Sequence, residues 1–208
     1  MIEVMVSTLT DNISIDDSIL IRQYRDGDIK AMERLIVKYQ DRIYNAIIRI
    51  CGNRDDAVEL TQDTFVKVLE GIDGFEGKSS FYTWLFRVAV NLTINHCKRR
   101  IRISPATLDG DEPGGGRSVA VSGLKHMLSD DGSPDPARLA IDREMCGFVH
   151  AALAQLDSDH RAIVVLRDIE GMNYTDISDA LGIEMGTVKS RLSRARGQLR
   201  GILEAMLK

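Results

Sequence analysis

Apolar residues recur at steps of three and four through the first half of the chain, which is the spacing of one helix face. One series predicts a long helix that ends at Gly52. A second predicts a helix that stops at Asp73 and Gly74, and a third helix follows Ser80, a side chain suited to cap a helix N-terminus. The expected inward positions are Ile29, Met32, Ile36, Tyr39, Ile43, Ile47 and Ile50, then Val58, Thr61, Phe65, Val68 or Leu69 and Ile72, then Phe81, Trp84 or Leu85, Val88 and Leu92.

The second half of the chain has the same helical spacing of apolar residues. Its last part predicts a short helix, a turn and a longer helix. Helices are expected over residues 139–156 and 158–169. After them, a short helix over 175–181, a turn over 182–186 and a helix over 187–207 have the spacing of a helix-turn-helix. Strand alternation is absent, so the expected fold is all-α. The inward positions of the helix over 139–156 are expected to be Ile141, Met145, Phe148, Val149, Ala152 and Leu153.

A segment of different composition separates the two halves. All four prolines of the chain lie between Pro105 and Pro136, together with a run of three glycines at 114–116. Such a segment resists regular structure, and here acidic residues outnumber basic ones. The sequence therefore predicts two helical domains, 15–103 and 138–208, joined by a flexible acidic linker over 104–137.

Composition narrows the class of protein. The hydrophobic share of 44% and the charged share of 28% are typical of a soluble globular protein. No apolar run approaches the roughly 20 residues of a membrane-spanning helix, and no export signal is recognisable, so we expect a cytoplasmic protein. The three cysteines suit neither a disulfide framework nor a metal site, and the four histidines lie in no catalytic pattern. We expect no metal, no cofactor and no enzymatic activity.

The last helix has a charge pattern that points to DNA. The chain carries a formal net charge of −4, yet residues 187–203 contain no acidic residue. On the helix face away from the apolar stripe, Ser190, Ser193 and Arg194 are placed to meet base edges in the major groove. Residues on the flanks of that face are placed to contact phosphates. The predicted DNA-binding set is Thr187, Lys189, Ser190, Arg191, Ser193, Arg194 and Arg196.

Two separate stretches resemble the extracytoplasmic-function sigma factors of the sigma-70 family, the group that includes the envelope-stress sigma factor. Residues 171–178 and 186–196 resemble the family's region four. In the first half, residues 57–68 resemble region 2.2 and residues 81–91 resemble regions 2.3 and 2.4. The resemblance implies a transcription initiation factor that directs bacterial RNA polymerase to specific promoters and assists their opening, with region 2 over 15–103 and region 4 over 138–208.

The resemblance also implies roles for residues of the first half. The region 2.2 helix is expected to dock on the clamp of the polymerase's largest subunit, although Val58 stands where a carboxylate is common in the family. The loop 75–80 is expected to capture a base from the melted minus-ten element. The matching polymerase-binding positions are Glu59, Leu60, Gln62, Asp63 and Phe65, and the matching minus-ten positions are Phe75, Lys78, Asn91, Lys98, Arg99 and Arg100.

Partners and one alternative follow from these expectations. The resemblance implies promoter DNA, core polymerase and an anti-sigma factor as partners, and a chain that is monomeric when free. The alternative is a helix-turn-helix regulator that binds DNA without polymerase and whose first half dimerises or senses a ligand. A dimeric mass and tight binding to a palindromic operator would favour the alternative.

Overall fold

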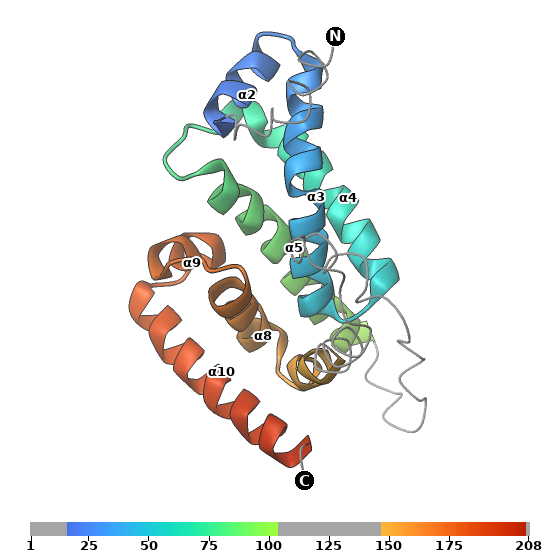
Figure 1. Cartoon of the computed structure of the whole chain (residues 1–208), viewed down its shortest axis with the longest axis vertical. Coiled ribbons are helices and arrows are strands. Elements are labelled where there is room, and N and C mark those ends of the chain that lie inside the picture. Colours follow the sequence, from blue (N-terminus) through green and yellow to red (C-terminus); the bar gives the residue numbers. More distant parts are fainter. Residues whose placement is uncertain (1–15, 104–146, 207–208) are drawn as a thin grey trace, which may run out of the picture.

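The computed structural model describes residues 16–103 and 147–206, and within these ranges the chain is all-helical, which confirms the predicted fold class. The expected linker lies outside the described residues. Figure 1 shows the helices of the first half side by side, with those of the second half packed against one flank. The elements are α2 (Asp17–Arg25), α3 (Ile29–Cys51), α4 (Arg54–Gly71), a 3-10 turn η1 (Ile72–Gly74), α5 (Phe81–Ile103), a helix over 147–154, α8 (Ser158–Val164), a π-helical turn η2 (Val165–Ile169), α9 (Tyr174–Leu181) and α10 (Met185–Met206).

Polar side chains set where the helices begin. The first backbone N–H groups of a helix have no partner within the helix, and a short polar side chain in front of it can accept from one of them. Ser80 does so for α5, since its Oγ accepts from the Thr83 N–H at 3.0 Å, as its position in the sequence predicted. The same arrangement begins α2, α3, α4, α8 and α9, through Asp16, Asp28, Asn53, Asp157 and Asn173.

Most of the predicted inward positions in the described residues are buried or half-buried, and four are exposed. Ile29 is 77% exposed because it is the first residue of α3, where no neighbouring helix covers it. Val58 is 44% exposed, because it lies on the outer face of α4. Phe148 and Val149 also face solvent, whereas Ala152 and Leu153 in the next turn are buried. The predicted inward positions Ile141 and Met145 lie outside the described residues.

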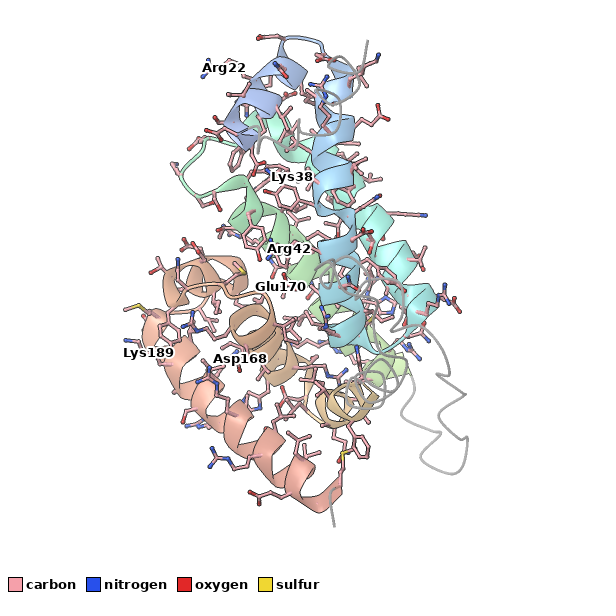
Figure 2. All side chains as sticks on the ribbon, in the orientation of Figure 1. Arg22, Lys38, Arg42, Asp168, Glu170 and Lys189 are labelled. Carbon is pink, nitrogen blue, oxygen red and sulfur yellow. The ribbon has the colours of Figure 1, made fainter. Side chains whose placement is uncertain are left out.

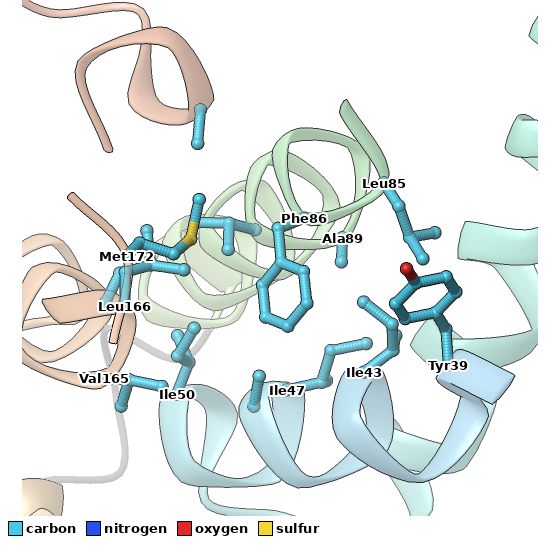
Figure 3. Close-up of a cluster of buried hydrophobic side chains, with 14 of the residues drawn as sticks. Tyr39, Ile43, Ile47, Ile50, Leu85, Phe86, Ala89, Val165, Leu166 and Met172 are labelled. Carbon is cyan, nitrogen blue, oxygen red and sulfur yellow. The ribbon is translucent and has the colours of Figure 1, made fainter. Parts of the chain in front are cut away.

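The two halves of the chain share one hydrophobic core (Figure 3). α9 packs on α5, and α8 packs on both α3 and α5. At this junction Ile47 and Phe86 from the first half belong to the same buried cluster as Leu166 and Met172 from the second. The centre of the contact between the halves is therefore apolar and shielded from water.

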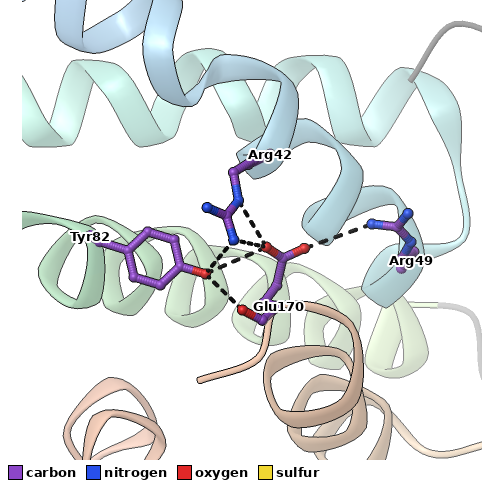
Figure 4. Close-up of polar contacts among 4 residues, drawn as sticks. All are labelled: Arg42, Arg49, Tyr82 and Glu170. Atoms are coloured by element: carbon purple, nitrogen blue, oxygen red, sulfur yellow. Dashed lines mark hydrogen bonds and ion pairs between the residues drawn. The ribbon is translucent and has the colours of Figure 1, made fainter. Parts of the chain in front are cut away.

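A polar contact lies beside this core (Figure 4). The Glu170 side chain, 6% exposed, sits between Arg42 and Arg49 of α3 and Tyr82 of α5. Arg42 Nε donates to Glu170 Oε2 at 3.3 Å, and Arg49 Nη1 lies 3.8 Å from Oε1. Burial, and next the negative charge of Glu170, raise the pKa of Tyr82 to about 12, so its hydroxyl stays protonated and donates to Glu170.

Arg161 of α8 makes a second polar link between the halves. Its Nη1 donates to the carbonyl of Ile50 at 2.7 Å, near the end of α3. Its Nη2 donates to the carbonyls of Ala154 and Leu156 at 2.7 and 2.8 Å. Carbonyls at helix ends lack partners within the helix and carry partial negative charge, so one guanidinium stabilises the ends of two helices.

Candidate nucleic-acid interface

α10 lies at the outer edge of the molecule, on the side away from the helices of the first half (Figure 2). Val188, Leu192 and Ala195 are buried against the rest of the second half. The opposite face carries Ser190, Ser193 and Arg194, all exposed, as the period predicted. A basic helix that is buried on one side and open along the other has the form that enters a major groove.

The remaining predicted residues of α10 lie on its flanks. Lys189 and Arg196 are exposed, and Thr187 and Arg191 are half-buried. Arg196 forms a salt bridge with both carboxylate oxygens of Asp168, through Nε at 3.1 Å and through Nη2. Because Asp168 already binds this guanidinium, a phosphate has to displace a carboxylate before it can pair with Arg196.

A basic cavity on this surface was not predicted from the sequence. It has a volume of about 420 Å³ and opens between α9 and α10. Tyr174 forms one wall, with Arg167 at 4.8 Å and Lys189 at 5.8 Å from its ring centroid. A cation against an aromatic face is stabilised by the ring quadrupole. The lining residues are Tyr174, Lys189, Leu192, Ser193, Arg196, Gly197 and Arg200.

One face of α5 carries the second group of candidates. Trp84, Asn91 and Lys98 recur every seven residues, which is close to two helical turns, so they share a face. Asn91 is exposed there, and Arg87, which sequence reasoning omitted, is exposed one turn before it. Tyr82, which contacts Glu170, lies about 180° around the helix from Asn91. Near Tyr82 the second half of the chain therefore packs on the side of α5 opposite Asn91, whereas closer to the end of the helix Lys98 contacts α8.

The basic end of α5 is partly occupied by neighbouring carboxylates. Lys98 Nζ lies 3.0 Å from Asp159 Oδ1 of α8, and Arg100 pairs with Asp56 of α4. Arg99 is exposed. These contacts agree with an ordinary charged helix end, and because they lie near the surface they are weak enough for DNA phosphates to compete with them.

The loop that precedes α5 brings Phe75 into an aromatic cluster. The Phe75 ring lies 5.1 Å from the Trp84 ring and 6.1 Å from the Phe81 ring, centroid to centroid. Phe75 and Trp84 are half-buried, whereas Phe81 is buried. Lys78 at the tip of the loop is exposed and pairs with Glu76.

α4 presents a separate exposed face. Glu59, Gln62 and Asp63 are exposed on it, so a partner can reach all three. Leu60 and Phe65 are buried in the core, so they support α4 from inside and offer no surface to a partner, which corrects their inclusion among the contact residues. Sequence reasoning missed the apolar part of this face, which consists of Val58, Val66 and Leu69.

The described residues show neither a metal cluster nor a membrane span. No group of three or more His, Cys, Asp or Glu side chains is placed to hold a metal ion within 16–103 and 147–206. Over the same ranges, no helix combines the length and the apolar character that crossing a bilayer requires. Cys51 is a half-buried free thiol, and burial raises its pKa to about 11, so it stays protonated.

Comparison with known proteins identifies both halves. Residues 35–103 match the family model for sigma-70 region 2, and residues 149–199 match that for sigma-70 region 4. The chain is 34% identical to the RNA polymerase sigma-H factor of Pseudomonas aeruginosa, over 92% of this chain and 96% of the relative. It is 30% identical to the ECF RNA polymerase sigma-E factor of Escherichia coli K12, over 88% of this chain and 91% of the relative.

Two solved structures have a similar fold. CnrH in complex with the cytosolic domain of CnrY matches with a TM-score of 0.62 at 25% identity, and covers 91% of this chain and 97% of that one. The sigma factor RpoE of Bartonella quintana, in complex with the anti-sigma factor NepR, matches with a TM-score of 0.61 at 26% identity over 85% and 98%.

Proposed function

This chain belongs to the extracytoplasmic-function sigma factors of the sigma-70 family, and from that premise we propose how it directs RNA polymerase to its promoters. α10 reads the minus-thirty-five element, and α5 with the loop 75–80 holds the melted minus-ten strand. The observation that carries the proposal is the exposed face of α10 over residues 187–203, which is basic and contains no acidic residue in a chain of net negative charge. The protein acts by binding, in the cytoplasm, and leaves the chemistry of RNA synthesis to the polymerase.

The role proposed for each side chain follows from its exposure and from its position on the helix. Ser190, Ser193 and Arg194 contact bases, while Lys189 and Arg191 contact phosphates from the flanks. On α5, Asn91 hydrogen-bonds to an unstacked base, and Arg99 follows the backbone beyond it. The domains that do this are region 2 over 15–103 and region 4 over 138–208, joined by the linker over 104–137.

The first test is run-off transcription by core polymerase from genomic fragments, with and without the protein. We expect start sites that require the protein and weaken about tenfold or more with Arg194→Ala, because one good base contact contributes about 1–3 kcal/mol. Arg34→Ala, which changes an arginine that is also exposed but lies on α3, serves as the control and should leave initiation unchanged. An absence of new start sites, together with tight DNA binding by the protein alone, would instead support a polymerase-independent regulator.

We propose that the exposed face of α4 docks on the clamp of the polymerase's largest subunit. Apolar residues at the centre of a rim of polar residues are typical of a binding surface, and here Val58, Val66 and Leu69 lie beside Glu59, Gln62 and Asp63. RpoE was solved in complex with the anti-sigma factor NepR, and CnrH in complex with the cytosolic domain of CnrY. We propose an anti-sigma partner for this chain too, and a chain that is monomeric when free of it.

Val66→Arg is expected to weaken binding to core polymerase about tenfold or more, because it places a charge at the centre of the docking face. The free energy of unfolding should change little, since Val66 is 50% exposed. The measurement is a titration of labelled protein with core enzyme. Val37→Arg on α3, where the valine is 63% exposed, is the matched control. Equal affinities for the two variants would rule out this face as the dock.

A further inference from the structure

Arg25, the last residue of α2, reaches the end of the chain segment formed by α4 and η1. Its Nη2 atom lies 2.5 Å from the carbonyl oxygen of Ile72 and 3.2 Å from that of Asp73. The same atom lies 2.7 Å from the carbonyl oxygen of Phe75, the first residue of the loop 75–80. Carbonyls at a helix end lack partners within the helix and attract a cation. One guanidinium therefore ties the end of the helix to the start of the loop.

Two further contacts fix the ends of the loop 75–80, one through the Phe75 ring and one through Ser80. The Phe75 ring packs on Trp84 and Phe81, and the Oγ of Ser80 accepts from the Thr83 N–H at 3.0 Å. Between these fixed points, residues 76–78 are exposed, and Gly77 has a φ of +73°, which other residues adopt only with strain. Residues 76–78 thus form a short exposed segment between two anchored residues, Phe75 and Ser80. Arg25 provides the backbone contact at Phe75.

We propose that Arg25 is a positioning residue for the capture of a minus-ten base by this loop. The inference rests on the proposed function of the loop. Arg25 sets the position of the Phe75 carbonyl, and thereby the direction in which the backbone leaves the aromatic cluster. A loop ordered before DNA arrives loses less conformational entropy on binding, so more of the binding free energy remains to offset extrusion of the base.

The experiment compares the wild-type chain, Arg25→Ala and Arg22→Ala, each assembled with core polymerase. Arg22 is the matched control, because it is exposed on the same helix one turn earlier and points outward in Figure 2. Templates are forked or fully duplex promoters from the mapped start sites, with each base placed in turn at each melted position. A third set carries the same promoters with the minus-ten segment already opened. Core affinity and melting temperature are measured alongside.

We expect Arg25→Ala to lose base discrimination at one melted position by about tenfold or more, the effect of losing hydrogen bonds to a charged group. Initiation on duplex should fall by a similar factor and recover on the opened templates, with core affinity unchanged. Arg22→Ala should match the wild type throughout. Wild-type discrimination in Arg25→Ala, or an equal loss on duplex and opened templates together with weaker core binding, would overturn the inference. If the wild-type chain initiates on no template, the proposed function itself fails.

Discussion

Replacing Phe86 by alanine is expected to lower the free energy of unfolding by about 3–5 kcal/mol, the range for truncating a fully buried aromatic side chain. Phe86 is completely buried, and its ring lies 4.5 Å from that of Tyr82. It belongs to the core that both halves share (Figure 3), so the cavity left behind weakens the packing of each half on the other. Chemical denaturation followed by circular dichroism measures the change.

Phe148→Ala provides the matched control, because it removes the same atoms from a side chain that is 36% exposed. We expect it to cost about 1 kcal/mol or less. Similar losses for the two variants would show that Phe86 does not hold the halves together in solution.

Changing Glu170 to lysine is expected to separate the two halves of the chain. The substitution puts a positive charge between Arg42 and Arg49 in place of the carboxylate that both arginines contact. Breaking a buried ion pair by removing one partner costs about 3–5 kcal/mol, and we expect the lower end here because Arg42 is half exposed and screened by solvent. The radius of gyration from small-angle X-ray scattering should rise, while helix content stays unchanged.

Glu204→Lys makes the same change of charge at an exposed position of α10 and should leave the radius of gyration unaltered. An unchanged radius for Glu170→Lys, at low and at moderate salt, would mean that the apolar contacts hold the halves together without the ion pairs.

The helices could be predicted from the sequence because long amphipathic periods and capping side chains act locally. The exceptions also have local causes. Period counting placed Ile29 inside, but a helix's first residue has few neighbours to cover it, and it placed Val58 inside, although α4 carries apolar residues on two faces. Spacing alone could not choose between Val68 and Leu69, whereas the structure buries Val68.

The site was predictable only in part. Some of its residues are placed by the helix that carries them, whereas others are placed by contacts with residues far away in the sequence. The exposed face of α10 follows from the residues of one helix, so Ser190, Ser193 and Arg194 could be placed in advance. Arg25 contacts carbonyls 47 to 50 residues away, and Arg42 contacts Glu170 at a separation of 128 residues. No local sequence pattern predicts such distant contacts. The predicted division into two domains also gave no indication that the two halves share a hydrophobic core.

The packing of α9 between α5 and α10 has a consequence for the length of DNA that the molecule can span. Helices in contact lie about 8–10 Å apart, which puts α10 roughly 20 Å from α5. Elements at minus thirty-five and minus ten are about 25 base pairs apart, or ~85 Å along B-form DNA at about 3.4 Å per base pair. A molecule that holds both elements must first part its halves. Each 1.4 kcal/mol of interface free energy then weakens promoter affinity about tenfold.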